Sequence, residues 1–131
     1  MKIVKILALS ALLSAGLAAD ETLVANMSQM EHGLNGIQKG FLYNTPELIK
    51  AGVSDIQKAN ALFHNVDVTK KYLPKEKRHM TNIAFNASKR IDSASASLLK
   101  ALDKREYVKA HQSYSEIVNE CTACHAVVRG W

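Results

Sequence analysis

Apolar residues recur every three or four positions in four separate segments of this 131-residue chain. That spacing places them on one face of an α-helix, whereas a half-buried strand would alternate at every second position. The first segment has a seam formed by Leu23, Met27, Met30, Leu34, Ile37 and Phe41. Aromatic residues are few and there are only two prolines, a balance that suits helices better than sheets. The sequence therefore predicts an all-α fold.

Turn residues divide the chain into four predicted helices. The expected boundaries are Gly40 at the end of the first helix, Thr45 and Pro46 at the start of the second, His64 near its end, a connection over residues 65–73, Pro74 at the start of the third helix and Asp103 as cap of the fourth. Amphipathic helices with short or moderate connections predict an antiparallel four-helix bundle. The length suits one domain, which we assign to residues 20–131.

Each of the later helices has its own predicted inward face. In the second helix it comprises Leu48, Ile49, Val53, Ile56, Ala59 and Phe63. In the third helix it comprises Met80, Ile83, Ala84, Ala87, Ile91, Ala94, Leu98 and Leu102. In the fourth helix it comprises Tyr107, His111, Tyr114, Ile117, Cys121, Cys124 and Val128.

Residues 1–19 have the layout of a secretory signal peptide. A short basic start with Lys2 and Lys5 precedes an apolar run over residues 6–13, and small residues follow it. The apolar run is too short to span a bilayer, and no later run reaches that length. Cleavage after Ala18 or Ala19 would leave fifteen basic against twelve acidic side chains, a net charge of +3. We therefore expect an exported, soluble protein that binds neither nucleic acid nor a membrane.

The only two cysteines stand in the pentapeptide CTACH, Cys121 to His125, close to the C-terminus. A thioredoxin-like pair would open a helix after a strand, and no strand pattern precedes this one. A zinc site needs about four ligands, and only one histidine is near. Two thiols three positions apart with an adjacent imidazole are typical of covalent haem c attachment, in which the thiols bind the vinyl groups and the imidazole binds iron.

The order of these features resembles the class II cytochromes c, the family of cytochrome c-prime and its six-coordinate relatives. The resemblance covers the whole mature chain. It rests on the four-helix pattern, on CTACH near the C-terminus, on Arg129 four residues later and on Ile37-Gln38-Lys39-Gly40 followed by Tyr43. It implies one haem c held by thioether bonds to Cys121 and Cys124, with His125 as the proximal iron ligand.

The resemblance leaves the distal side of the iron with two alternatives. Cytochrome c-prime keeps the sixth position open behind an apolar residue and can admit nitric oxide or carbon monoxide, whereas its low-spin relatives place a methionine there and carry electrons. An ungapped alignment on Lys39-Gly40 puts Val24 at this position. A shift of about one turn puts Met27 there instead, with Met30 as the second candidate. Methionine also fills gaps in cores, so packing is the alternative role for both.

Two further features have both a functional and a structural interpretation. Arg129 could contact a haem carboxylate or stand over His125, or simply suit a helix C-terminus. A cluster of cations could dock an acidic redox partner or form a solvated loop; it comprises Lys70, Lys71, Lys75, Lys77 and Arg78. We expect none of His32, His64, His79 and His111 to bind iron.

These observations predict a periplasmic electron carrier with His–Met iron ligation and no enzymatic activity. Its expected partners are periplasmic redox proteins, and the sequence leaves open whether it forms a homodimer. The alternative is a five-coordinate protein that binds nitric oxide or carbon monoxide. A third interpretation is a haem-free exported bundle whose cysteines form a disulfide or bind a metal.

Overall fold

The chain is helical throughout the part that the computed structural model describes, which is the backbone of residues 2–130 and the side chains of residues 21–130. No strand occurs in residues 2–130, so the predicted all-α class is confirmed. The predicted signal peptide, residues 1–19, lies outside the residues whose side chains are described. Among the described residues, no helix combines the length and the apolar character needed to cross a membrane.

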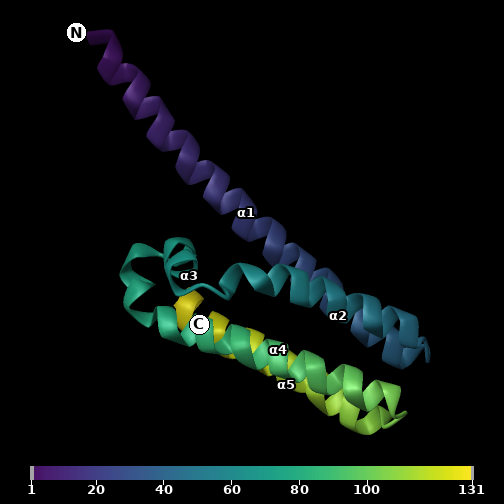
Figure 1. Cartoon of the computed structure of the whole chain (residues 1–131). Helices are drawn as coiled ribbons and strands as arrows, with labels where there is room; N and C mark the ends of the chain where they lie inside the picture. The colour runs from purple at the N-terminus through teal and green to yellow at the C-terminus, as the bar shows by residue number, and fades with distance from the viewer. Residues whose placement is uncertain (1, 131) are drawn as a thin grey trace.

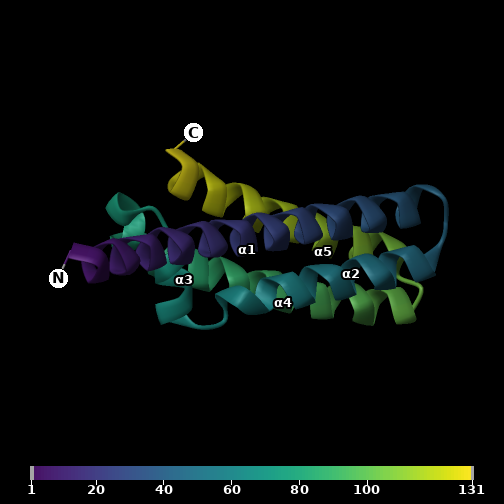
Figure 2. The ribbon, with the colours of Figure 1, turned by 90° about the horizontal axis from the view of Figure 1, so that it is seen from above.

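Two helical hairpins make up most of the molecule (Figure 1). Helix α1 (Lys2–Leu42) turns back into α2 (Pro46–Asn60), and α4 (Thr81–Asp103) turns back into α5 (Tyr107–His125). Both tight turns lie at one end, and Figure 2 shows the long helices side by side. Helix α2 packs against α4, and α1 against α5. The long helices thus run alternately up and down.

The opposite end is closed by short elements. Between the hairpins come the 3₁₀ turn η1 (Ala61–Phe63), helix α3 (Val66–Tyr72) and the 3₁₀ turn η2 (Lys75–Met80). After α5, the π-helical turn η3 (Ala126–Gly130) ends the described chain. Helix α3 and the C-terminus lie at the same end of the molecule (Figure 1). The CTACH segment is therefore at the end that α3 covers.

The predicted seams form the core. Large side chains that are fully buried come from every long helix and include Ile37, Val53, Ile56, Leu98 and Ile117. The seam of α1 is buried or half-buried at all six predicted positions. Burying each such aliphatic side chain contributes about 1.5–3 kcal/mol relative to exposure. Burial of these apolar faces, within and between the hairpins, is thus the main source of stability.

Glycines bring α1 and α2 close together. A Cβ atom added to Gly33 would lie 2.6 Å from the carbonyl oxygen of Gly52, and one added to Gly52 would approach the Gly33 carbonyl even more closely. Real Cβ atoms do not come so near to backbone. Each helix therefore presents bare backbone to the other at this crossing, which places Ile37 of α1 against Gly52 of α2.

The predicted connection over residues 65–73 is wrong in part, because it contains α3. Asn65 caps this helix, and its side-chain oxygen accepts from the backbone N–H groups of Asp67 and Val68 at 2.9 and 3.1 Å. Pro74 does not start the long third helix. It precedes η2, and α4 begins at Thr81. Pro74 lacks an N–H and has an extended backbone here, which ends α3 and forces the break.

The other helix ends differ less from prediction. Helix α1 continues past Gly40 to Leu42, and Asn44 makes the turn with φ of 52°, a left-handed conformation that asparagine tolerates. Pro46 does begin α2. Asp103 is the last residue of α4 rather than the cap of α5, a position taken by Glu106. Residues 104–106 form the turn between α4 and α5, and Arg105 adopts a left-handed conformation in it, with φ of 58°.

Four residues predicted to face inward are exposed instead: Leu48, Ile83, Tyr107 and His111. Leu48 is adjacent to Ile49, which takes the inward place and is only 2% exposed. Tyr107 and His111 lie in the first turns of α5, where the helix reaches the end of the molecule. Apolar spacing identifies a helix face but does not say where the neighbouring helices stop.

Candidate functional site

Helix α5 carries both thiols and the imidazole on one face. Cys124 and His125 follow Cys121 by three and four positions, which on an α-helix puts both side chains next to that of Cys121. All three are half-buried. The helix then changes to the π-helical turn η3, and such wide turns are often found at functional sites. The predicted attachment residues therefore stand together at one end of the fold.

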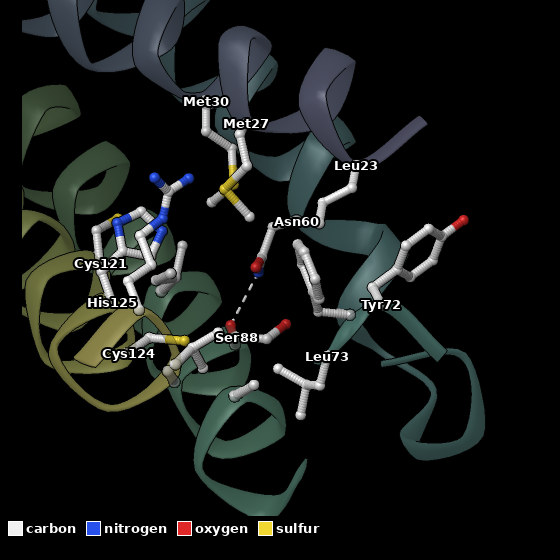
Figure 3. A pocket seen from close by; sticks show the side chains of 16 residues that line it. Leu23, Met27, Met30, Asn60, Tyr72, Leu73, Ser88, Cys121, Cys124 and His125 are labelled. Atoms are coloured by element: carbon white, nitrogen blue, oxygen red, sulfur yellow. Dashed lines mark hydrogen bonds between the residues drawn. The ribbon is translucent and has the colours of Figure 1, made fainter. Parts of the chain in front are cut away.

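A cavity lies directly against these three side chains (Figure 3). Its volume is about 100 Å³. Ligand sites usually have about 300–1,000 Å³, so a large ligand would require the walls to move apart. The walls come from α1, α2, α3, α4, α5 and the short elements η1 and η3. Most of the lining is aliphatic or aromatic, so the cavity excludes polar ligands that cannot also offer a large apolar surface.

Two methionines of α1 line the cavity from the opposite side. Met27 and Met30 point into it toward the α5 side chains (Figure 3). Met30 is 6% exposed and belongs to the aliphatic core, whereas Met27 is half-buried and packs against that core. The structure therefore brings both predicted sulfur donors to the cavity that holds His125.

Val24 does not reach the cavity. Its side chain is 63% exposed, and it is absent from the lining. Leu23 and Met27 take the inward positions in this part of α1. Val24, the residue that the ungapped alignment put at the distal position, thus lies off the apolar seam that faces the cavity.

Burial keeps the two thiols neutral. It raises the pKa of Cys121 to about 11, and the neighbouring Cys124 adds to the effect. Burial also raises the pKa of Cys124, with a further contribution from Glu120. A reactive or metal-binding cysteine is normally a thiolate with a lowered pKa. The pair therefore lacks the electrostatics of a redox-active dithiol.

His125 is held in its neutral form. Burial lowers its pKa below the ordinary value, and the positive charge of Arg129 lowers it further. A neutral imidazole has a free lone pair on one ring nitrogen and can act as a metal ligand at neutral pH. Arg129, one turn later, lines the cavity from its exposed rim, as the sequence analysis allowed.

The cavity also contains two buried polar side chains that the sequence analysis did not identify. Asn60 at the end of α2 and Ser88 in α4 are 1% and 2% exposed. The Asn60 amide donates to the Ser88 carbonyl oxygen and to Asp92 Oδ1, each at 2.8 Å. No local motif in the sequence distinguishes these two residues from ordinary polar positions on a helix.

The remaining histidines lie outside the cavity lining. His32 is within 3.1 Å of Asp55, and His64 Nε2 is 2.6 Å from Asp92 Oδ2. His79 is exposed on η2, and the exposed His111 packs edge-on against Phe41 with ring centroids 5.2 Å apart. None of the four faces the Cys121–His125 segment.

Within the part of the chain whose side chains are described, no group of three or more histidine, cysteine or acidic residues is placed to hold a metal ion. The candidate site is therefore a cavity with one imidazole, two thiols and two thioethers, and it differs from a metal centre built from protein ligands alone. Comparison of the chain with protein-family models, with curated proteins and with solved structures finds no match.

Proposed function

We propose that this protein is a mono-haem c-type cytochrome that carries electrons in the periplasm. In this proposal residues 1–19 direct export, and residues 20–131 form a four-helix bundle of the class II type. One observation carries the proposal: both thiols, the imidazole and both methionine sulfurs line the same cavity. Proximity along the sequence explains the first three, and the two methionines of α1 reach the same cavity from the opposite side.

The residues present fit a covalently bound haem. The cavity has mainly apolar walls, as cofactor sites do. The thiols of Cys121 and Cys124, three positions apart on one face, match the spacing of thioether attachment. The neutral imidazole of His125 would supply a nitrogen ligand, and a thioether from α1 would supply a sulfur ligand. When bound, haem supplies reversible one-electron chemistry.

The chain sets the properties of that chemistry. A methionine sulfur is a soft ligand that favours the reduced metal and raises the reduction potential. The apolar walls disfavour extra positive charge in the cavity and act in the same direction. The exposed Arg129 lies on the rim, where it can offset the charge of a carboxylate at the cavity mouth.

The cluster of cations fits a docking role next to the cavity. Its members stand on α3 and η2, the segment that also contributes Tyr72 and Leu73 to the cavity wall. Among the described residues none of these five cations takes part in an ion pair. An acidic redox partner would thus be steered to the side of the molecule where electrons enter.

The five-coordinate alternative is the less favoured one. It needs an apolar residue rather than a sulfur over the iron; Val24 lies outside the cavity, and although Leu23 lines it, two methionines line it as well. Rapid binding of carbon monoxide to the reduced protein would favour the gas-binding function, whereas slow or absent binding would favour the carrier.

The attachment is tested by replacing both thiols. We expect Cys121→Ser with Cys124→Ser to lose all covalent haem, so that acidified acetone extracts every haem from the variant and none from the wild type. Each single variant should retain one thioether bond, which the pyridine haemochrome spectrum reports as a shift toward free haem. Haem that stays with the double variant through extraction would contradict the proposed attachment.

A further inference from the structure

An ion pair joins the two helices of the second hairpin next to the CTACH segment. Arg90 Nε of α4 lies 2.7 Å from Glu120 Oε2 of α5. The Glu120 side chain is only 21% exposed and its Oε2 atom is buried, whereas the Arg90 side chain is 54% exposed. The anion of the pair therefore stands on the protein side, and the cation stands on the solvent side.

The charge of the carboxylate is only partly compensated. Although Arg90 is close, Glu120 Oε2 forms no hydrogen bond with the described residues, because the guanidinium N–H is not aligned with this oxygen. Water and salt screen an exposed charge more strongly than a half-buried one. The protein interior beside the pair therefore experiences a net negative charge.

Glu120 lies next to both cysteines. It directly precedes Cys121 and stands four positions before Cys124, so the helix places its side chain beside that of Cys124. Burial raises the pKa of both thiols, and the negative charge of Glu120 raises it further. This contribution has the sign of the anion, so the thiols are closer to Glu120 than to Arg90.

The carboxylate acts on the cavity without contacting it. Glu120 is absent from the lining, so it can influence a group inside only through its electric field. The charge that acts on His125 has the opposite sign: burial lowers the pKa of the imidazole, and Arg129 lowers it further. Arg129 is exposed on the rim, where solvent screens it. Glu120 is therefore the less screened of the two charges.

We propose that Glu120, positioned by Arg90, lowers the reduction potential of the haem and so counteracts the methionine sulfur and the apolar walls. This inference rests on the proposed function. A haem joined to Cys121 and Cys124 would be held at the two thiols that the Glu120 charge reaches. Ferric haem carries one more positive charge than ferrous haem, so a fixed anion stabilises the ferric form.

Reduction potentials of the purified holoprotein at neutral pH test the proposal. Glu120→Gln removes the charge and keeps the shape of the side chain, so it should raise the potential. Arg90→Gln leaves the anion without its cation and should lower the potential. The opposite signs are the decisive feature. A looser contact between α4 and α5 would change the exposure of the cavity to water and shift both variants in the same direction.

Glu116→Gln is the matched control. Glu116 is exposed one turn earlier on the same face of α5, so its charge is screened and this variant should shift the potential clearly less than Glu120→Gln. The Glu120→Gln shift should also persist at high salt, because burial limits screening.

Two results would overturn the inference: shifts of the same sign in the Glu120 and Arg90 variants, or a Glu120→Gln shift no larger than that of Glu116→Gln. Either result in a protein with covalent haem would leave the proposed function standing. A wild-type protein that contains no haem after export and purification would overturn both.

Discussion

Gly33→Ala should lower the free energy of unfolding by about 3 kcal/mol, the upper end of the usual cost of overpacking. The added methyl group would lie 2.6 Å from the Gly52 carbonyl oxygen and 2.8 Å from Cγ1 of Ile56. Because the closer atom is backbone, a rotamer change cannot relieve the clash, and α1 must move away from α2. Denaturant unfolding followed by circular dichroism measures the change through the midpoint and slope.

Gly36→Ala is the matched control in the same helix. A Cβ atom there would lie 3.6 Å from its nearest neighbours, the Gly52 Cα and the Leu48 carbonyl oxygen, which is ordinary contact. Alanine is favoured over glycine in a helix by about 1 kcal/mol, so this variant should be as stable as the wild type or slightly more. Equal destabilisation by both substitutions would contradict the close packing of α1 on α2.

Met27→Leu should convert a low-spin protein into a high-spin one that binds carbon monoxide rapidly. Leucine keeps the volume and apolar character of methionine but removes the sulfur, so packing changes little while the ligand is lost. We choose Met27 because it is half-buried at the cavity, whereas Met30 is 6% exposed within the aliphatic core. Optical and electron paramagnetic resonance spectra report the spin state.

Met30→Leu is the corresponding control, and it should keep the low-spin spectrum and the near-infrared sulfur-to-iron band of the oxidised protein. The reverse outcome, with Met30→Leu opening the iron, would exchange the roles of the two methionines. A wild-type protein that is already high-spin would contradict sulfur ligation by either residue and would favour gas binding.

Much of the fold could be predicted from apolar spacing alone. The seam of α1 is buried or half-buried and the inward positions Val53, Ile91 and Ile117 are buried, as expected, because a period of three to four residues specifies one helix face. The spacing cannot show where a neighbouring helix ends, and Tyr107 is exposed for that reason. Helix α3 was missed although Asn65 and Asp67 are a recognisable start signal, because the segment is too short to show a seam.

The candidate site was predictable where its residues are close in sequence. Cys121, Cys124 and His125 share a face by their spacing, and the seam of α1 indicated Met27 and Met30. Their meeting across one cavity depends on how the hairpins pack, which the sequence alone does not give. Asn60 and Ser88 lie on different helices, and their place in the cavity wall is seen only in the folded chain.

The mass of the intact protein, purified after export, tests the covalent haem most directly. Under denaturing conditions we expect the mass of the chain cleaved after Ala18 or Ala19 plus one haem, and fragmentation should locate the addition between Cys121 and Cys124. The mass of the polypeptide alone, or of the polypeptide less two hydrogens as in a disulfide, would contradict the proposal that Cys121 and Cys124 hold a haem.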